Sequence, residues 1–169
     1  MSIIIREARP EDAAKMIAYV NALLEEPESF LELSKGEFTL TVGEEMRFLE
    51  NCWISPNSIF IVAADDGKIV GQLLCNGSRR AKVRHSVVLG MSVDQKYRDK
   101  GIGSMLMEYA IEWAKGTSIV KRIELYVFKT NKRAIHLYEK YGFVIEGEKQ
   151  KAIKINGEYI NEYIMALMV

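Results

Sequence analysis

The stretch Tyr97–Leu106, YRDKGIGSML, joins a run of apolar residues to an amphipathic segment. The run before it, residues 87–93, is rich in β-branched side chains and is typical of a buried strand. In the segment after it, residues 102–113, apolar side chains recur at three- and four-residue spacing, which predicts a helix. Gly101 and Gly103 stand where this helix begins. Unpaired N–H groups, the positive end of the helix dipole and missing side chains make such a place favourable for phosphate.

Three kinds of loop compete for this pattern. A phosphate-binding nucleotide loop would end in Gly-Lys-Ser or Gly-Lys-Thr, whereas the chain has Gly103-Ser104, so that interpretation fails. A dinucleotide fingerprint would need a third glycine where Leu106 stands. A strand-to-helix turn without any ligand stays as the alternative to a binding site. Arg98 favours the site, because a cation beside exposed amides suits a pyrophosphate.

Length and composition narrow the class of protein. The 169 residues suffice for one domain with a substantial core, and 23 basic residues balance 23 acidic ones. This balance argues against nucleic acid or an anionic membrane surface as a partner. Cys52 and Cys75 lie in apolar surroundings without metal-ligand spacing, which predicts reduced core thiols and no metal. Because no apolar run has membrane length and the first residues do not form a signal peptide, we expect a soluble cytoplasmic protein.

Strand and helix patterns alternate along the chain. The predicted strands are residues 3–8, 59–64, 69–75, 87–93, 121–128, 144–155 and 158–168, and the predicted helices begin near Pro10, Thr41 or Gly43, Ile102 and Asn131. The second helix is expected to place Met46, Leu49 and Trp53 on one side. Residues 28–40 have no period and predict a mobile connection.

The predicted order, βααβββαβαββ, contains one β-α-β crossover, whose two strands should be parallel. A parallel pair puts the loops that follow its strands at the same edge of the sheet, where ligands bind. Residues 98–104 and residues 131–138 should therefore be neighbours in space.

Two blocks of the sequence resemble a known family, the GCN5-related N-acetyltransferases (GNAT). Residues 98–103, RDKGIG, match the family's Arg/Gln-x-x-Gly-x-Gly/Ala pyrophosphate loop, and residues 131–143, NKRAIHLYEKYGF, resemble its Asn-x-x-Ala…Leu-Tyr…Gly-Phe signature. Residues 155–159, INGEY, are similar to bacterial members that acetylate free amino acids or other small amines. The resemblance implies a single N-acetyltransferase domain over residues 1–169. Its implied fold is α/β (α+β), with a mixed twisted sheet of about seven strands and four helices.

The resemblance also implies that acetyl-CoA is the cosubstrate and lies in the splay between the strands that end at Val93 and Val127. The residues implied to bind it are Met91, Ser92, Val93, Arg98, Asp99, Lys100, Gly101, Ile102, Gly103, Ser104, Asn131, Ala134 and Tyr138. Among them, Met91 and Val93 would pair with the pantetheine arm through their backbone groups, as an added strand would. Residues 98–104 would hold the pyrophosphate, and Asn131 would bond the pantetheine.

Acetyl transfer from a thioester to an amine needs a neutral amine, a stabilised oxyanion and a proton for the leaving thiolate. By the resemblance, Tyr138 would face the sulfur and donate that proton; without it, Tyr138 reads as a core aromatic. Glu124, on the strand beside the site, is the candidate base, directly or through water. The alternative for Glu124 is one half of a surface ion pair. His85 and His136 are predicted to be solvated.

The predicted function is an N-acetyltransferase that moves an acetyl group from acetyl-CoA to the primary amine of a small molecule or amino acid by direct attack. The alternatives are a protein N-terminal acetyltransferase of the ribosomal-protein type and a non-catalytic acyl-CoA-binding module. The acceptor is expected to meet residues 28–40, the second helix and the loop around Arg80. Relatives often pair as dimers, so a homodimer is expected, with no nucleic acid or membrane partner.

Overall fold

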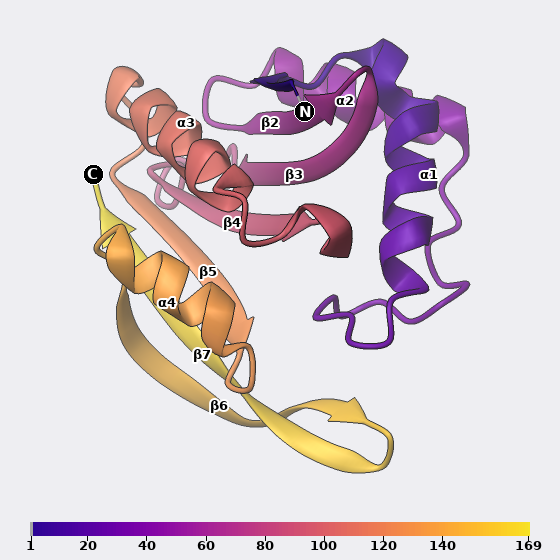
Figure 1. The fold of residues 1–169 in the computed structure, drawn as a ribbon. Coiled ribbons are helices and arrows are strands. Elements are labelled where there is room, and N and C mark those ends of the chain that lie inside the picture. Colours follow the sequence, from indigo (N-terminus) through magenta and orange to yellow (C-terminus); the bar gives the residue numbers. More distant parts are fainter. Residues whose placement is uncertain (1) are drawn as a thin grey trace.

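The protein is a seven-stranded mixed sheet with helices on both faces (Figure 1). The computed structural model describes residues 2–169. In chain order the elements are β1 (Ile3–Glu7), η1 (Pro10–Asp12), α1 (Ala13–Leu24), α2 (Val42–Trp53), β2 (Ile59–Asp65), β3 (Lys68–Gly77), β4 (Ser86–Val93), η2 (Gln95–Tyr97), α3 (Ile102–Gly116), β5 (Arg122–Phe128), α4 (Lys132–Lys140), β6 (Val144–Ile155) and β7 (Glu158–Met168). The η elements are single 3-10 turns. The strand order is β1-β2-β3-β4-β5-β7-β6. The predicted order of elements is confirmed, and the segment between α1 and α2 is irregular, as expected.

The two faces of the sheet carry separate hydrophobic cores. One core joins α3 and α4 to the strands through residues such as Leu106, Tyr138 and Cys75. The other joins α1 and α2 to the opposite face through residues such as Met16 and Cys52. Burial raises the pKa of the Cys52 thiol to about 11 and that of the Cys75 thiol to about 12, and neither cysteine forms a disulfide.

The crossover β4-α3-β5 creates a gap in the middle of the sheet. As predicted, β4 and β5 are parallel, but they pair only from Ser86–Leu89 to Arg122–Leu125. Beyond these residues the strands diverge, and no strand lies against the β5 side of β4 from residue 90 to residue 93 (Figure 1). The gap leaves backbone N–H and C=O groups of β4 open to another partner.

The buried face of α2 differs from the expectation. Thr41 caps this helix in a capping box with Glu44, close to the predicted start. Leu49 is buried, but Trp53 is 54% exposed, and the core side of the helix includes Glu45 and Cys52. The spacing of apolar residues in the sequence does not predict a buried carboxyl at this position. Burial raises the pKa of Glu45.

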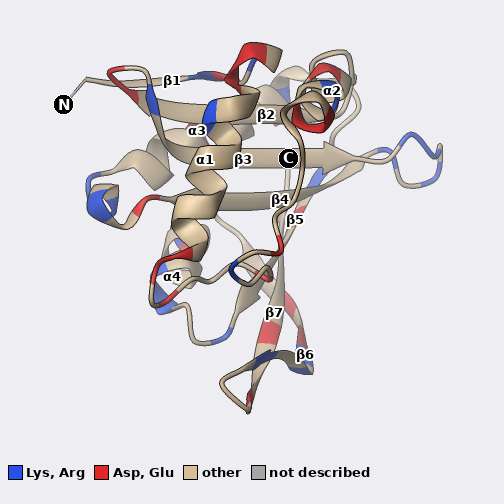
Figure 2. Ribbon diagram, turned by 90° about the vertical axis from the view of Figure 1, so that its right-hand side faces the viewer, with Lys and Arg blue, Asp and Glu red and all other residues tan. Residues whose placement is uncertain are grey.

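Two hairpins extend from the body of the sheet. The β6–β7 hairpin turns at Asn156-Gly157, both with positive φ, as the Asn-Gly pair predicts. The connection between β3 and β4 projects from the end of the sheet and carries basic side chains at its tip (Figure 2). No helix formed by residues 2–169 combines the length and apolar character needed to cross a bilayer.

Candidate active site

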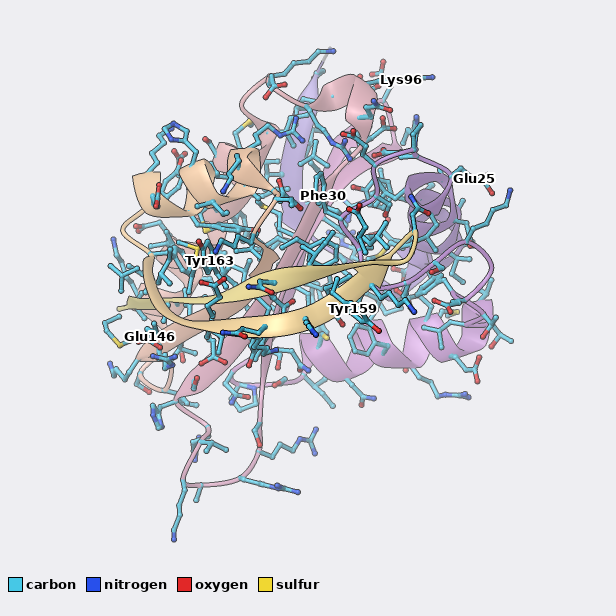
Figure 3. All side chains as sticks on the ribbon, turned by 90° about the horizontal axis from the view of Figure 1, so that it is seen from below. Glu25, Phe30, Lys96, Glu146, Tyr159 and Tyr163 are labelled. Atoms are coloured by element: carbon cyan, nitrogen blue, oxygen red, sulfur yellow. The ribbon has the colours of Figure 1, made fainter. Side chains whose placement is uncertain are left out.

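A cleft of about 660 Å³ occupies the gap between β4 and β5. Its walls come from both faces of the sheet, because Leu23 of α1 and Tyr138 of α4 both line it. We call the part lined by α3, α4 and residues 98–104 the α4-side half, and the part lined by α1 and residues 29–32 the α1-side half. Phe30 lies at the centre of the molecule seen from below (Figure 3). The cleft therefore has walls that belong to both faces of the sheet.

The loop before α3 presents a row of free backbone N–H groups to the α4-side half. Within residues 2–169, no oxygen accepts a hydrogen bond from the N–H groups of residues 99–104, and the first paired amide is that of Met105, which donates to Gly101 O at 3.0 Å. Asp99 and Gly101 have φ of 59° and 82°, and this left-handed backbone is favourable only for glycine and a few polar residues. Successive amides at a helix start form a site for a diphosphate.

Gly103 allows α3, α4 and β4 to approach closely beside these amides. A Cβ on Gly103 would lie 3.1 Å from Leu137 Cδ2 and 3.8 Å from Met91 Cε. Ile102, next to it, is buried in the core and also contributes to the wall of the cleft. The glycine thus keeps the floor of the α4-side half open.

The guanidinium of Arg98 lines the cleft but is already engaged by protein groups. Its Nε donates to Val93 O at 2.8 Å, and its Nη2 forms an ion pair with Glu26 at the end of α1. Glu26 Oε1 also accepts from Gln95 N at 3.0 Å. Arg98 therefore fixes the loop in place, and its charge is balanced by Glu26, whereas the sequence predicts a charge free for a pyrophosphate.

The two signature blocks meet, as the crossover predicts. Arg133 Nη1 lies 3.3 Å from Asp99 Oδ2, and Lys140 Nζ lies 3.4 Å from Ser104 Oγ. Lys100 is the one residue of the loop 98–104 that does not line the cleft, and its ammonium donates to Lys96 O at 2.7 Å. Only the N–H group of Lys100 can serve a ligand there.

Asn131 and Ala134 form the start of α4 at the edge of the cleft. Asn131 Oδ1 accepts from Ala134 N at 3.2 Å and caps the helix. Its Nδ2 makes no hydrogen bond to residues 2–169 and remains able to donate to a ligand. Both residues line the α4-side half, where the resemblance places the pantetheine.

Tyr138 projects from α4 into the wall of the cleft. The residue is 6% exposed, and its ring packs against Phe143 with the centroids 5.8 Å apart. Burial raises the pKa of the Tyr138 hydroxyl to about 12, so the phenol is protonated at neutral pH. Among residues 2–169, its hydroxyl has no hydrogen-bond partner. A protonated phenol without a partner can act as a proton donor.

Met91, Ser92 and Val93 line the cleft along the unpaired side of β4. The Ser92 hydroxyl faces α1, where it lies 3.2 Å from the Tyr19 hydroxyl. Burial raises the pKa of Tyr19 well above its usual range, which keeps this pair uncharged. The wall that these residues form along β4 is therefore uncharged.

Glu124 does not line the cleft. Its carboxylate accepts from Arg122 Nη2 at 2.5 Å and from the Tyr126 hydroxyl at 2.6 Å, and these bonds lower its pKa. Arg122 also binds Glu146, which lies well apart from Phe30 in Figure 3. The structure supports the ion-pair alternative for Glu124, with Tyr126 between its carboxylate and the cleft.

We expect Glu124→Gln to keep kcat within about threefold of the wild-type value, with a superimposable pH–rate profile, because an ion pair outside the cleft carries no proton for the reaction. The measurement is steady-state kinetics from pH 6 to pH 9. Tyr126→Phe is the matched variant, since it keeps the ring and removes the bond to Glu124. An acid limb that shifts in both variants would instead make Glu124 a base that acts through Tyr126.

Sequence reasoning missed two residues of the α1-side half, Glu26 and Glu162. Residues 29–32 line the cleft as expected of the connection, whereas α2 and the loop around Arg80 do not. Glu162 had a signal, because it alternates with Ile160 and Ile164 on one face of β7, and a charge on an apolar face indicates a buried ion. Glu26 had none, since its partner is distant in sequence.

Comparisons with known proteins identify relatives of this chain in sequence and in fold. Over 106 residues the chain is 42% identical to the L-amino acid N-acetyltransferase AaaT of Escherichia coli (strain K12), a match that covers 63% of this chain and 65% of that protein. The chain thus spans less than two thirds of the length of this curated relative.

Solved structures confirm the predicted fold. The acetyltransferase of GNAT family from Streptococcus pneumoniae superposes with a TM-score of 0.96 at 37% identity, over 99% of this chain and 100% of that one. The yncA protein of Salmonella typhimurium, solved with its cofactor acetyl-CoA, shares the fold with a TM-score of 0.84 at 18% identity, over 99% and 94% of the two chains. A model of the acetyltransferase (GNAT) family matches residues 24–143, and the chain belongs to this family.

Proposed function

We propose that this protein transfers an acetyl group from acetyl-CoA to the primary amine of a small molecule or amino acid. The observation that carries the proposal is the row of unpaired N–H groups at residues 99–104, at one end of a cleft that also contains the Tyr138 phenol. The likeness to an L-amino acid N-acetyltransferase supports the acceptor class.

The residues of the α4-side half fit acetyl-CoA. Its diphosphate suits the amides of residues 99–104, and its extended pantetheine arm suits the open side of β4 and the free Nδ2 of Asn131. When bound, acetyl-CoA supplies the thioester whose carbonyl carbon the amine attacks. We propose a binding role for all the predicted cosubstrate residues except the side chain of Lys100 and, as a direct ligand, the guanidinium of Arg98.

The chain's own groups would then guide the transfer. Backbone N–H groups on the open side of β4, near residues 91–93, are the candidates to receive the oxyanion. Tyr138 donates its proton to the departing sulfur, and its raised pKa keeps that proton available at neutral pH. The amine reaches the reaction from the α1-side half and must lose one proton on the way, which solvent in the cleft can accept.

A panel of acceptors tests this function. Thiol release from acetyl-CoA is measured with free amino acids, polyamines, arylalkylamines and short peptides. We expect release with one or more small amines or amino acids. Release with peptides alone would establish the N-terminal acetyltransferase alternative, and acetyl-CoA binding without release for any acceptor would establish the binding module.

Two further proposals concern the protein as a whole. The buried, unpaired thiols of Cys52 and Cys75 support the reducing cytoplasm as its compartment. The homodimer stays a prediction, which sedimentation equilibrium of the purified protein tests.

A further inference from the structure

A buried carboxylate, that of Glu162, lines the α1-side half of the cleft. Glu162 lies on β7 opposite Phe128 of β5, and only 2% of its surface is exposed. Burying a carboxylate is costly unless a partner compensates for the lost hydration. The burial of Glu162 therefore lowers the stability of the fold, and a function of its carboxylate in the cleft would explain that loss.

The protein satisfies only one of the two oxygens of this carboxylate. Lys149 Nζ of β6 donates to Glu162 Oε2 at 2.9 Å. Lys149 also lies over the ring of Tyr126, 4.0 Å from its centroid, which fixes the ammonium in place. Within residues 2–169, Glu162 Oε1 accepts no hydrogen bond. This oxygen is also not fully buried, so a ligand in the cleft can reach it.

The surroundings of this free oxygen suit a cation with an apolar arm. The charged side chains that residues 23–32 and β7 bring to the cleft are all acidic: Glu26, Glu32 and Glu162. Arg98 neutralises Glu26, so Glu162 is the buried acid of this half with an oxygen to spare. Phe30 packs edge-on against Phe128, with the ring centroids 6.1 Å apart, and provides an apolar wall beside it.

We infer that Glu162 binds the ammonium group of the acceptor through Oε1, while the acceptor's apolar arm lies against Phe30 and Phe128. This inference rests on the proposed acetyl transfer and names the residue that selects its acceptor. Lys149 is a positioning residue, because its hydrogen bond to Oε2 fixes the orientation of the carboxylate and leaves Oε1 free. A hydrogen bond between a charged donor and a carboxylate is stronger than one between neutral groups.

The first test compares Glu162→Gln with Glu148→Gln, using 2-phenylethylamine as acceptor at saturating acetyl-CoA. Glu148 is the matched control, because it lies on the same β6–β7 hairpin as Glu162 and does not line the cleft. It also pairs with a lysine, Lys129, at 2.7 Å. We expect Glu162→Gln to raise KM for the amine about 10- to 30-fold, the worth of one charged hydrogen bond, and to change kcat little. Glu148→Gln should leave both constants unchanged.

Affinity for acetyl-CoA, measured by calorimetry, should be the same in both variants and the wild type. An unchanged KM in Glu162→Gln, or an equal rise in both variants, would reduce Glu162 to a structural ion pair and overturn the inference.

The second test needs no variant that must fold. Calorimetry measures the binding of 2-phenylethylamine and of its uncharged isostere 2-phenylethanol to the wild-type protein saturated with CoA. We expect the ammonium to bind about tenfold or more tightly than the alcohol, for the same charged bond. Equal affinities, or no binding of the amine, overturn the inference.

The two proposals fail separately. A protein that prefers the ammonium but releases no thiol with any acceptor keeps the assignment of Glu162 and loses the acetyltransferase activity. One that acetylates amines with an unchanged KM in Glu162→Gln keeps the activity and loses the assignment.

Discussion

Tyr138→Phe should lower kcat by about 10² or more, the usual effect of losing a general acid, and should leave the affinity for acetyl-CoA nearly unchanged. The reason lies in what the substitution removes. Phenylalanine keeps the packing of the ring against Phe143, and the lost hydroxyl has no partner among residues 2–169. Folding should therefore be unaffected, so the loss would report on the reaction. Steady-state kinetics and calorimetry with acetyl-CoA measure the two effects.

Tyr141→Phe is the control for this prediction. Its hydroxyl lies at the end of the same helix and does not line the cleft; it donates to Glu108 Oε1 at 2.7 Å and makes a longer contact of 3.4 Å to Ser104 O. Turnover should be the same as in the wild type. Equal turnover in Tyr138→Phe and Tyr141→Phe would remove Tyr138 from the mechanism.

The raised pKa of Tyr138 adds a dependence on pH. A group whose pKa is raised to about 12 keeps its proton up to that pH, so proton donation is present below it and is lost only as the pH rises toward 12. The wild-type kcat should consequently show no basic limb due to Tyr138 between pH 7 and pH 10.

Gly103→Val should weaken the binding of acetyl-CoA about 10²-fold, as expected when two charge-assisted hydrogen bonds of about 1.5 kcal/mol each are lost. The valine Cβ would lie 3.1 Å from Leu137 Cδ2, so its methyl groups would crowd the wall of the α4-side half, to which Gly103 and Leu137 both contribute. There they would keep a diphosphate from the amides of residues 99–104. Calorimetry with acetyl-CoA measures the change.

Gly116→Val is the matched control for Gly103→Val. Gly116 ends the same helix, and a Cβ there meets no atom within 4 Å. Its affinity for acetyl-CoA should equal that of the wild type, and circular dichroism checks that both variants fold. Full affinity in Gly103→Val would mean that the diphosphate binds elsewhere.

Local patterns in the sequence sufficed for the parts of the site that lie close together in the chain. The strand, the glycine loop and the helix of residues 87–113 are contiguous, and the handedness of the crossover then brings residues 131–138 beside them. The N–H groups of residues 99–104 follow directly from a helix start.

The parts that could not be predicted depend on side chains from distant elements. Arg98 meets Glu26 across the sheet, and no motif encodes which acid a cation will find. On β5, Glu124 and Tyr126 share the face opposite the buried residues, as the alternating pattern predicts. The pairing of Glu124 with Arg122, however, depends on the side-chain conformations at the sheet surface. On α2, the buried face includes Glu45 instead of only the expected apolar residues, because the helix packs against α1 as well as against the sheet.

The division of the hydrophobic interior by the sheet gives this protein two built-in chemical probes. Each core contains one cysteine, Cys75 on the α3 and α4 side and Cys52 on the α1 and α2 side. Burial raises the pKa of both thiols, so a disulfide reagent reacts with them only when the surrounding packing opens. The labelling rates of the two thiols thus compare the local opening of the two faces, without any introduced label.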